Sequence, residues 1–521
     1  MAPTIPSSVL RARFVALVGG LALLLAGCRN QPSPTHRATP TRPVAADQSD
    51  GPGASNGDDE TDGESTESDE STSRPGAPPP YRAHPLDALF RKFDRAEASQ
   101  KQQRVSILHV GDSHTASDTI TGRIRVLFQD KFGSAGRGYT YPGEPWSTFR
   151  QEQTTYAMSD HWEGHLGIVR DPSPPFGAGG VRVETAAEGA WLERGSCGID
   201  DAEKSGSSAS DESDEETCRY GRNFDRYAIT YLVRKGGGSF TVSVDGNRPT
   251  VVETAGNGPS VGVFERGVEA GPHRIRIETE GDGPVGLFGI RTRLGDNGIE
   301  YHSLGINGAT AGDFASFHPE LTRQEIQALG PDLLLFAFGT NEAFNFYRMR
   351  QDHSLEAVTE AMADYQFKFR QLLERYRAAA PQAACLVMLP PDVAPERDDV
   401  PCRKKETVGD REVCLPPTIR GWGSVVATQR AEARRAGCAV WSQSKAMGGE
   451  GRIRLWAAMT PPLARSDGIH LTMDGYDLLA EAFFSDLMRT YEVWKKGGQL
   501  PLETRTISEG SSRGLLRDAF R

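Results

Sequence analysis

The stretch V-S-I-L-H-V-G-D-S-H-T-A-S-D, from Val105 to Asp118, decides the fold of this chain. It begins as an apolar, β-branched run that stops at Gly111, and residues 119–132 then carry apolar side chains at helical spacing. A strand, a sharp glycine turn and a helix place Ser113 at the carboxyl end of a strand, where open α/β sheets bind ligands. A serine in such a place is either part of an ordinary capped turn or, with a base in reach, a nucleophile.

Strands and helices alternate again in the second half of the chain. The run D-L-L-L-F-A-F at 332–338 is continuously apolar, as expected for a parallel strand that is buried on both faces. This alternation predicts a mostly parallel sheet with helices on both faces, a three-layer α/β/α domain. Further strands are expected at 298–304, 384–389 and 438–441, helices at 86–93, 355–376, 419–435 and 473–491, and a polar loop at 395–417.

Between the two α/β segments the pattern changes to short runs of period two, which are typical of antiparallel strands. Examples are Y-A-I-T-Y-L-V at 227–233 and S-F-T-V-S-V-D at 239–245, the second followed by a hairpin turn at Asp245-Gly246. We therefore predict an antiparallel β-sandwich, inserted into the α/β domain over residues 155–295. Five of its aromatic residues are expected mainly in the core, with stacking on a sugar as the alternative: Trp162, Trp191, Tyr220, Phe224 and Tyr227.

The N-terminal residues have the features of an export signal and a tether. Arg11 and Arg13 precede an apolar run, 14–25, that is short for a membrane span and is followed by small residues. Residues 1–27 are therefore expected to be a cleaved signal peptide. Residues 28–80, rich in Pro, Ser, Thr, Gly and acidic side chains, are expected to be a disordered tether.

The end of the signal, Leu25-Ala26-Gly27-Cys28, resembles a bacterial lipobox. The resemblance implies that Cys28 becomes the lipidated first residue of an exported lipoprotein of the bacterial cell envelope. Arg29, rather than an aspartate, follows the cysteine, which by resemblance to Gram-negative sorting implies the outer membrane, facing the periplasm or the cell surface. The alternative is an ordinary signal peptide with an unrelated cysteine.

Export implies an oxidising compartment, in which cysteines form disulfides. Six of the seven cysteines remain when Cys28 is set aside, and many pairings are possible. Their spacing fits no zinc site, so neither a metal nor a cofactor is expected. We prefer Cys197–Cys218 and Cys402–Cys414, which close local loops, and Cys385–Cys438, which joins two strands.

The formal net charge of −11 comes from two acidic tracts. Residues 47–70 hold ten acidic side chains and no basic one, and residues 200–216 hold eight acidic side chains and one lysine. Such tracts are typically solvated and disordered, and the rest of the chain is mildly basic, which suits an anionic polymer. Because no Lys/Arg-rich run with interleaved aromatic residues is present, no nucleic-acid partner is expected.

Four polar stretches follow predicted strands of the α/β domain, and together they hold the groups that acyl transfer requires. Ser113 supplies a hydroxyl, His470 a base near neutral pH, and Asp467 a carboxylate that orients the imidazole. The amides of Ser113 and Gly308 and the side chain of Asn341 are expected to stabilise the oxyanion. Structural alternatives exist, with His470 and Asp467 as helix caps and Asn341 as a turn residue.

These stretches resemble the four sequence blocks of the SGNH or GDSL hydrolases, in the same chain order. The resemblance covers about 105–132 and 298–490 and implies a flavodoxin-like, three-layer α/β/α fold. His114 stands where the family has leucine, and Glu342 where it has aspartate. Ser113, Gly308, Asn341 and His470 fall on the family's four named positions, in the blocks G-D-S-H at 111–114, G-I-N-G-A-T at 305–310, G-T-N-E at 339–342 and S-D-G-I-H-L-T at 466–472.

Within that family, the block G-D-S-H-T-A-S-D, the downstream G-R-G-Y at 136–139 and the inserted β domain are similar to peptidoglycan O-acetylesterases, whose insertion resembles a carbohydrate-binding module. The resemblance implies a serine esterase that removes O-acetyl groups from peptidoglycan or another cell-wall or surface glycan through an acetyl-Ser113 intermediate. A glycan O-acetyltransferase of the same fold and a non-catalytic glycan-binding lipoprotein remain alternatives. A lipid or aryl esterase is less favoured, because no long apolar lid is visible.

The chain is therefore expected to have six parts. They are a signal peptide at 1–27, a tether at 28–80, the first part of the hydrolase domain at 81–154, the β-sandwich at 155–295, the second part of the hydrolase domain at 296–495, and a loosely attached C-terminal tail at 496–521.

Overall fold

The computed structural model describes residues 84–98, 103–168, 175–199, 218–394 and 402–507, all within one compact unit, Pro79–Arg521. The expected signal peptide, Cys28 and the tether before residue 80 lie outside the described residues, as does the second acidic tract. None of the helices in the described ranges is long and apolar enough to cross a membrane.

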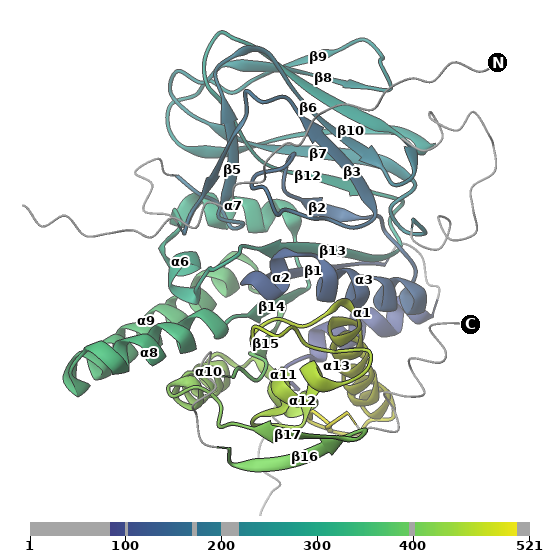
Figure 1. Ribbon diagram of the computed structural model, residues 1–521. Helices are drawn as coiled ribbons and strands as arrows, with labels where there is room; N and C mark the ends of the chain where they lie inside the picture. The colour runs from purple at the N-terminus through teal and green to yellow at the C-terminus, as the bar shows by residue number, and fades with distance from the viewer. Residues whose placement is uncertain (1–83, 99–102, 169–174, 200–217, 395–401, 508–521) are drawn as a thin grey trace, which may run out of the picture. The chain divides into compact units, whose positions relative to one another are not determined.

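A five-stranded parallel sheet forms the centre of the α/β domain (Figure 1). Its second strand in the chain lies at the edge beside the first, and the others follow in chain order, which is the flavodoxin-like arrangement and confirms the predicted fold. Gly111 at the end of the first strand lies opposite Gly305 and Ala337, the last residues of its two neighbours. In spatial order the strands are β13 (Gly298–Gly305), β1 (Arg104–Gly111), β14 (Leu333–Ala337), β15 (Ala384–Leu389) and β18 (Ala439–Ser442).

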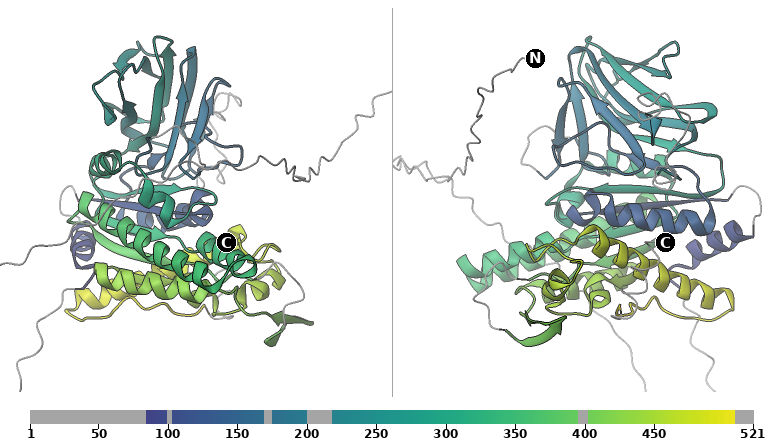
Figure 2. Two further views of the ribbon diagram at one scale, coloured as in Figure 1. Left: turned by 90° about the vertical axis from the view of Figure 1, so that its left-hand side faces the viewer. Right: turned by 45° about the vertical axis from the view of Figure 1, so that its right-hand side comes forward.

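Helices cover both faces of this sheet, which explains why its strands are apolar throughout (Figure 2). Val105 and Ile107 of β1 enter one core, and Leu108 and Val110 enter the other. The first core is lined by α1 (Asp87–Glu97), α3 (Thr119–Phe132), α11 (Gln443–Met447), α12 (Arg452–Ala458) and α13 (Met473–Lys495). The second is lined by α6 (Ala311–Ser316), α7 (Pro319–Leu329), α8 (Thr340–Asp352), α9 (Leu355–Ala379) and α10 (Trp422–Ala436), and the short α2 (Ser113–Ala116) follows β1.

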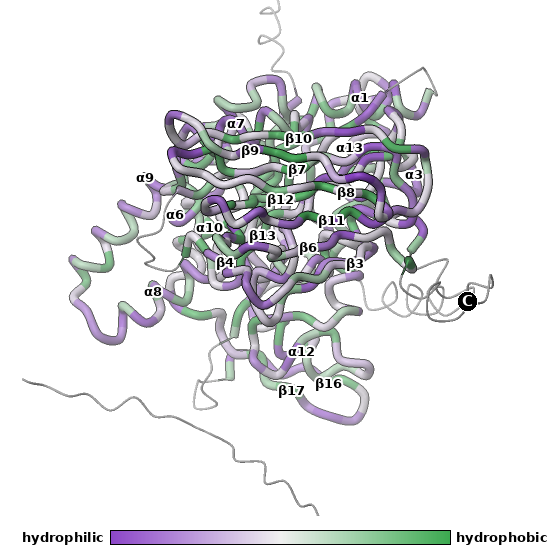
Figure 3. Tube along the Cα trace, turned by 90° about the horizontal axis from the view of Figure 1, so that it is seen from above, coloured by the Kyte–Doolittle hydropathy of each residue, from purple (hydrophilic) through white to green (hydrophobic). Residues whose placement is uncertain are grey.

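The inserted domain is a sandwich of two antiparallel sheets around a third core (Figure 2). Figure 3 looks onto this domain and shows polar and apolar residues alternating along its strands. One sheet has the order β10 (Ser260–Gly271), β7 (Phe224–Val233), β12 (Val285–Arg293), β5 (Val181–Thr185) and β4 (Glu163–Leu166), with β2 (Gly138–Thr140) paired to β12. The other has the order β3 (Thr154–Met158), β6 (Glu188–Ser196), β11 (Arg274–Glu280), β8 (Ser239–Val244) and β9 (Thr250–Glu253).

The strand pairing extends the sandwich to before residue 155. The three residues of β2 pair with β12, and β3 begins at Thr154. Gly138 opens β2 with a φ of 85°, and a side chain there would clash with the carbonyl oxygen of Tyr301 on β13. A strand this short and glycine-rich has no readable periodicity, so the sequence did not indicate it.

The aromatic residues of the sandwich are engaged in packing contacts. The ring of Trp191 lies under the guanidinium of Arg276, 4.9 Å from the ring centroid, and the Tyr220 hydroxyl donates a hydrogen bond to Asp130 of α3 at 2.5 Å. These contacts favour packing over sugar stacking, as the sequence suggested. Buried in the sandwich core are Trp162, Phe224 and Tyr227.

The predicted polar loop at 395–417 contains a hairpin in its described part. Strands β16 (Lys404–Val408) and β17 (Arg411–Leu415) pair around Gly409, whose φ is 59°. Both strands are mostly exposed, which explains why their sequence lacks the apolar pattern of a buried strand.

The tail was expected to be loosely attached, and its described part is not. The Ser442 amide donates to the Thr504 hydroxyl at 2.8 Å, and the Ile507 amide donates to the Ala446 carbonyl at 2.9 Å. Arg505 also contacts the buried carboxylate of Asp486. The chain therefore runs back along β18 and α11 as far as residue 507.

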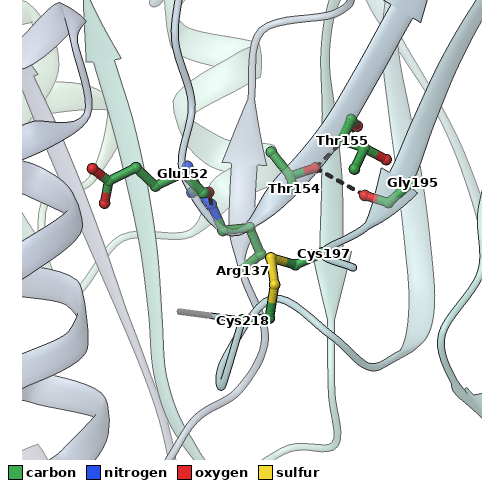
Figure 4. Close-up of a disulfide and its surroundings, with 7 residues drawn as sticks. All are labelled: Arg137, Glu152, Thr154, Thr155, Gly195, Cys197 and Cys218. Atoms are coloured by element: carbon green, nitrogen blue, oxygen red, sulfur yellow. Dashed lines mark hydrogen bonds between the residues drawn. A yellow bond between two sulfur atoms is a disulfide. The ribbon is translucent and has the colours of Figure 1, made fainter. Parts of the chain in front are cut away.

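Three disulfides join the pairs that the sequence favoured: Cys197–Cys218, Cys385–Cys438 and Cys402–Cys414. Cys385 is in β15 and Cys438 directly precedes β18, where the register sets Leu386 opposite Ala439, so this disulfide links neighbouring strands. Figure 4 shows the Cys197–Cys218 bond at the end of β6, beside Arg137.

Candidate active site

Ser113, His470 and Asp467 form a hydrogen-bonded relay at the carboxyl end of the parallel sheet. The Ser113 Oγ lies 3.1 Å from His470 Nε2, and His470 Nδ1 lies 2.9 Å from Asp467 Oδ2. Because Nδ1 faces a carboxylate, we assign the ring proton to it, which leaves Nε2 able to accept the serine proton. The structure thus brings together a hydroxyl and an imidazole that are 357 positions apart in the chain.

A tight turn after β1 presents the serine. Ser113 is the first residue of α2, and the side chain of Asp112 caps the helix by accepting a hydrogen bond from the His114 amide at 3.0 Å. Glycine is required at position 111, because a Cβ there would lie only 2.6 Å from the carbonyl oxygen of Ala337 on the neighbouring strand. The turn can therefore pass close to β14 before the chain reaches the nucleophile.

Asp467 is held as a carboxylate by three N–H groups. Its Oδ1 accepts from the amides of Ile469 at 2.8 Å and His470 at 2.9 Å, and its Oδ2 faces the His470 ring. Partial burial raises the pKa of Asp467, but these hydrogen bonds outweigh it and hold the pKa below the usual value. An ionised Asp467 fixes the imidazole and stabilises its protonated form.

Three hydrogen-bond donors come from the ends of three adjacent strands. The amides of Ser113 and Gly308 donate to no acceptor within the described part of the chain. Gly308 has a φ of 82°, a left-handed conformation that suits glycine. Asn341 donates one N–H of its side-chain amide to the Ala309 carbonyl at 2.8 Å, which orients the group and leaves its second N–H for an oxyanion.

Glu342 joins two of these turns. Its carboxylate accepts from the Ala311 amide at 2.7 Å and from the Gly339 amide at 3.0 Å. Burial raises the pKa of Glu342 to about 7, against the opposing effect of these amides. The glutamate therefore positions the turns that carry Gly308 and Asn341, although the resembling family has aspartate here.

His114 lies behind the relay rather than on the surface. It is 2 % exposed, its Nδ1 lies 2.8 Å from the Tyr476 hydroxyl, and its ring centroid is 5.4 Å from that of His470. Burial and the neighbouring His470 lower its pKa to about 3, so the ring is neutral. Asp112, also buried, has its pKa raised by burial to about 8. Both residues support the catalytic turn.

The relay opens into a pocket of about 1010 Å³. Ser113, Gly308, Asn341 and His470 all line it, so the structure brings the nucleophile, the base and the oxyanion donors to one cavity. A second wall comes from residues 148–156, the segment that connects β2 to β3 of the sandwich. The lining residues of that segment are Thr148, Arg150, Gln151, Glu152 and Tyr156.

A buried ionic group, here called the Asp118 cluster, fastens this second wall to the start of α3. Asp118 Oδ2 lies 2.5 Å from Arg137 and accepts the Glu152 amide at 3.0 Å, and Arg125 lies 3.2 Å from Oδ1. Arg137 also donates from Nε to the Glu152 carbonyl at 2.8 Å (Figure 4). Burial alone would raise the pKa of Asp118, but the two arginines lower it below its usual value.

Sequence reasoning missed the basic side chains around this pocket. Arg150, Arg348 and Arg465 line it, one from each of the β2–β3 segment, α8 and the loop before Asp467. One signal was available for Arg348, because it follows Asn341 by seven positions and therefore lies on the same face of a helix. No comparable signal in the sequence marked Arg150 or Arg465.

Comparisons with known proteins point to an ester hydrolase fold. Residues 279–483 match the model of the GDSL-like lipase/acylhydrolase family. A solved structure described as a peptidoglycan O-acetylesterase in action is similar, with a TM-score of 0.58 and 22% identity over 79% of this chain and 97% of that one. No curated protein sequence matches this chain.

Two family two carbohydrate esterases match more weakly. The one from Cellvibrio japonicus has a TM-score of 0.23 and 12% identity, over 66% of this chain and 99% of that one. The one from Clostridium thermocellum, in complex with cellohexaose, has a TM-score of 0.22 and 14% identity, over 70% of this chain and 100% of that one.

The family match begins at residue 279 and so leaves out the segment with Ser113. The sandwich separates that segment from the rest of the domain in the chain, while the sheet places β1 between β13 and β14. Residues 279–483 of this chain therefore match the GDSL-like lipase/acylhydrolase family, and the chain shares the fold of the structure described as a peptidoglycan O-acetylesterase, with an antiparallel β-sandwich inserted after the first strand and helices.

Proposed function

We propose that this chain is a serine esterase that removes O-acetyl groups from a cell-wall or surface glycan, with peptidoglycan as the first candidate. The observation that carries the proposal is the relay from Ser113 to His470 at 3.1 Å and from His470 to Asp467 at 2.9 Å, beside a pocket of about 1010 Å³. The GDSL-like domain supports acyl-ester chemistry. The fold shared with a peptidoglycan O-acetylesterase supports a glycan as the acyl carrier.

In the first half of the reaction Ser113 becomes acetylated. His470 takes the proton from Oγ as this oxygen attacks the acetyl carbonyl, and Asp467 stabilises the imidazolium that forms. The carbonyl oxygen becomes an oxyanion and accepts hydrogen bonds from the amides of Ser113 and Gly308 and from Asn341. The C–O bond to the sugar then breaks, and the proton on His470 passes to the sugar oxygen.

In the second half, water releases the acetyl group. His470 removes a proton from a water molecule that attacks the carbonyl carbon of acetyl-Ser113, and the same donors stabilise the second oxyanion. Collapse of this intermediate breaks the bond to Oγ, which regains its proton from His470. The products are acetate and the free enzyme.

The pocket favours a polar polymer over a long acyl chain. Its volume is at the upper end of the range for sites of small ligands, and its lining includes several polar side chains. Asn307, whose side-chain amide donates to the Thr148 hydroxyl at 3.3 Å, and the exposed Asn345 can form hydrogen bonds with sugar hydroxyls. An acetyl group fills only a small part of this space, so the remainder is available for the glycan.

The decisive assay measures acetate released from O-acetylated peptidoglycan, acetylated xylan and a chromogenic acetate. We expect release from the peptidoglycan by the parent protein and none by Ser113→Ala, with an unchanged far-UV spectrum and melting temperature as evidence of folding. Turnover that survives in Ser113→Ala would refute the mechanism. Acetyl groups that appear on an added glycan instead of in solution would show a transferase, and release from the chromogenic ester alone would exclude the glycan as substrate.

We also propose that Cys28 anchors the protein to the cell envelope of a bacterium, on the basis of the Leu-Ala-Gly-Cys sequence. The experiment is metabolic labelling with a radioactive fatty acid in a Gram-negative host, followed by membrane fractionation. The parent protein should carry the label and sediment with outer membranes, and Cys28→Ala should do neither. A labelled Cys28→Ala protein, or an unlabelled parent, would contradict the anchor.

A further inference from the structure

The side chains of three arginines around the pocket have no hydrogen-bond or ion-pair partner in the described part of the chain. Arg150, Arg348 and Arg465 are all exposed, and none forms a side-chain hydrogen bond or an ion pair there. Some exposed arginines elsewhere are paired, as Arg323 is with Glu320 and Arg435 with Glu432. Three unpaired guanidinium groups that converge from three separate elements on one cavity are therefore available for a ligand.

The pocket has little negative charge to balance them. Among the described residues that line it, Glu152 is the one with a carboxyl group. Burial raises the pKa of Glu152 to about 7, so near neutral pH it is only partly ionised. Its carboxyl group also lies against Gly122 of α3, because a Cβ on that glycine would clash with it. A cleft lined mainly by one sign of charge concentrates ligands of the opposite sign.

We propose that Arg150, Arg348 and Arg465 form an anion subsite that binds a carboxylate carried by the glycan close to the acetyl ester. This inference rests on the proposed function and names the chemistry of the substrate more closely. A guanidinium group matches a carboxylate with two parallel hydrogen bonds, and arginine is weakly hydrated compared with lysine, which suits recognition of a planar anion. A neutral acetylated polysaccharide lacks this group and so loses these bonds.

The subsite also gives the inserted domain a part in recognition. Arg150 belongs to the segment between β2 and β3, while Arg348 is on α8 and Arg465 lies two residues before Asp467. Tyr156, at the start of the sandwich, lies in the same wall as Arg150. The carboxylate is therefore bound between the α/β domain and the chain that leads into the sandwich.

Because the arginines are proposed to bind a carboxylate and not the ester that reacts, they should contribute equally to the ground state and the transition state. Their loss then raises KM and leaves kcat nearly unchanged, which distinguishes them from the relay. Their exposure also makes the interaction sensitive to salt over the range in which the Debye length falls from about 10 to about 3 Å.

The test compares an anionic with a neutral acetylated polymer. The variants are Arg348→Gln and Arg465→Gln, and the matched control is Arg248→Gln, an exposed arginine in the turn between β8 and β9. We measure the ratio of kcat/KM on acetylated polygalacturonate to kcat/KM on acetylated xylan. The ratio should fall about tenfold in each pocket variant, through KM, and should stay within twofold in the control. If the ratio of the two kcat/KM values stayed unchanged in the double variant Arg348→Gln/Arg465→Gln, the subsite would be overturned.

A second measurement needs no glycan turnover, so it separates failure of the subsite from failure of the proposed function. Unacetylated polygalacturonate should inhibit hydrolysis of the chromogenic acetate competitively. Its inhibition constant should be about tenfold higher in the pocket variants than in the parent. Salt at 0.5 M should also raise this constant strongly, because the screening length is then roughly fourfold shorter than in dilute buffer. Equal inhibition of all variants would contradict the subsite even if the esterase is real.

Peptidoglycan identifies the source of the carboxylate. O-acetylated peptidoglycan is assayed before and after an amidase removes its peptides. If the carboxylate is the one on the sugar, which the amidase frees when it cleaves the amide to the peptide, the difference between parent and Arg348→Gln appears or grows after peptide removal. If it belongs to the peptide, the difference disappears. Both results support a carboxylate subsite, and equal KM values for parent and variant on both preparations would overturn it.

Discussion

The α/β domain and the segment leading into the sandwich build opposite walls of one pocket in different ways. On the α/β side, the reacting groups are fixed: Asp467 accepts two backbone N–H groups, and the Asn341 amide is tied to the Ala309 carbonyl. On the other side, Arg150 is exposed, and its side chain forms no hydrogen bond or ion pair with the described residues. The contrast teaches that hydrogen bonds fix the groups at the sheet ends, whereas the opposite wall presents an exposed arginine that no such bond holds in place.

The two walls are nevertheless fastened to each other below the surface. The Asp118 cluster joins the start of α3 to Arg137 and to the backbone of Glu152. Further along the chain, Tyr139 of β2 donates a hydrogen bond to the buried Glu325 of α7 at 2.5 Å. The wall with Arg150 therefore starts from a rigid base, and its exposed side chains are the adaptable part.

The largest effect is expected in the relay. Ser113→Ala and His470→Ala should each lower kcat by about 10⁵–10⁶-fold, and the double variant should lose no more than either single variant, because the two groups act as one unit. Steady-state kinetics on the chromogenic acetate measure this. Losses that multiply in the double variant would mean that the hydroxyl and the imidazole act independently, and the 3.1 Å contact would then have no catalytic meaning.

The next effect is on stability and tests the fastening of the two walls. Asp118→Asn leaves Arg125 and Arg137 buried without a carboxylate, so the free energy of unfolding should fall by about 3–5 kcal/mol. Asp130→Asn is the control, because Asp130 is exposed on α3 and contacts Arg219 and Tyr220 after the acidic tract. Asp130→Asn should lower the free energy of unfolding by less than about 1 kcal/mol. If urea unfolding gave equal free energies of unfolding for the two variants, the Asp118 cluster would not be what fastens the two walls together.

A comparable effect on rate is expected at the oxyanion donors. Asn341→Ala should lower kcat by about 10²–10³-fold, equivalent to about 3–4 kcal/mol, with little change in KM, because the hydrogen bond forms fully only in the transition state. Asn345→Ala, one turn further along α8, is the matched control and should lose less than tenfold in kcat. If Asn341→Ala raised KM alone, the side chain would bind the ground state and not an oxyanion.

The fold and the relay could be predicted because their signals are local. An apolar run followed by Gly111, Asp112 and Ser113 specifies a strand end, and parallel strands bring such ends to the same edge of a sheet. Cys402 and Cys414 lie twelve positions apart, so a short loop brings them together almost regardless of the fold. The sequence therefore indicated best those features that depend on residues close together in the chain.

The remaining features depend on contacts between distant segments. An exposed arginine such as Arg465 looks the same in the sequence whether it faces a pocket or open solvent. His114 could not be assigned to the interior, because its burial depends on Tyr476 of α13. The docking of Thr504 against Ser442 likewise depends on a hydrogen bond from the Ser442 amide to the Thr504 hydroxyl, which no periodic pattern in the sequence indicates.

The smallest effect concerns the pH dependence of the catalytic turn. Burial raises the pKa of Asp112 to about 8, above its ordinary value near 4, so the folded protein keeps a proton that the unfolded chain releases between these values. The contribution of this proton to stability is complete below pH 4 and is lost as pH rises towards 8. Within that window the free energy of unfolding should fall by at most about 1.4 kcal/mol per pH unit from this group.

Asp112→Asn separates this group from all others that titrate. The amide is neutral at every pH and can still accept the hydrogen bond of the His114 amide, so the variant should gain stability relative to the parent as pH rises from 5 to 8. Asp130→Asn removes an exposed carboxylate instead, and its unfolding free energy should run parallel to that of the parent. Parallel curves for Asp112→Asn as well would mean that the turn accommodates a charged Asp112. In that case the turn that carries Ser113 would be less rigid than its contrast with the exposed Arg150 requires.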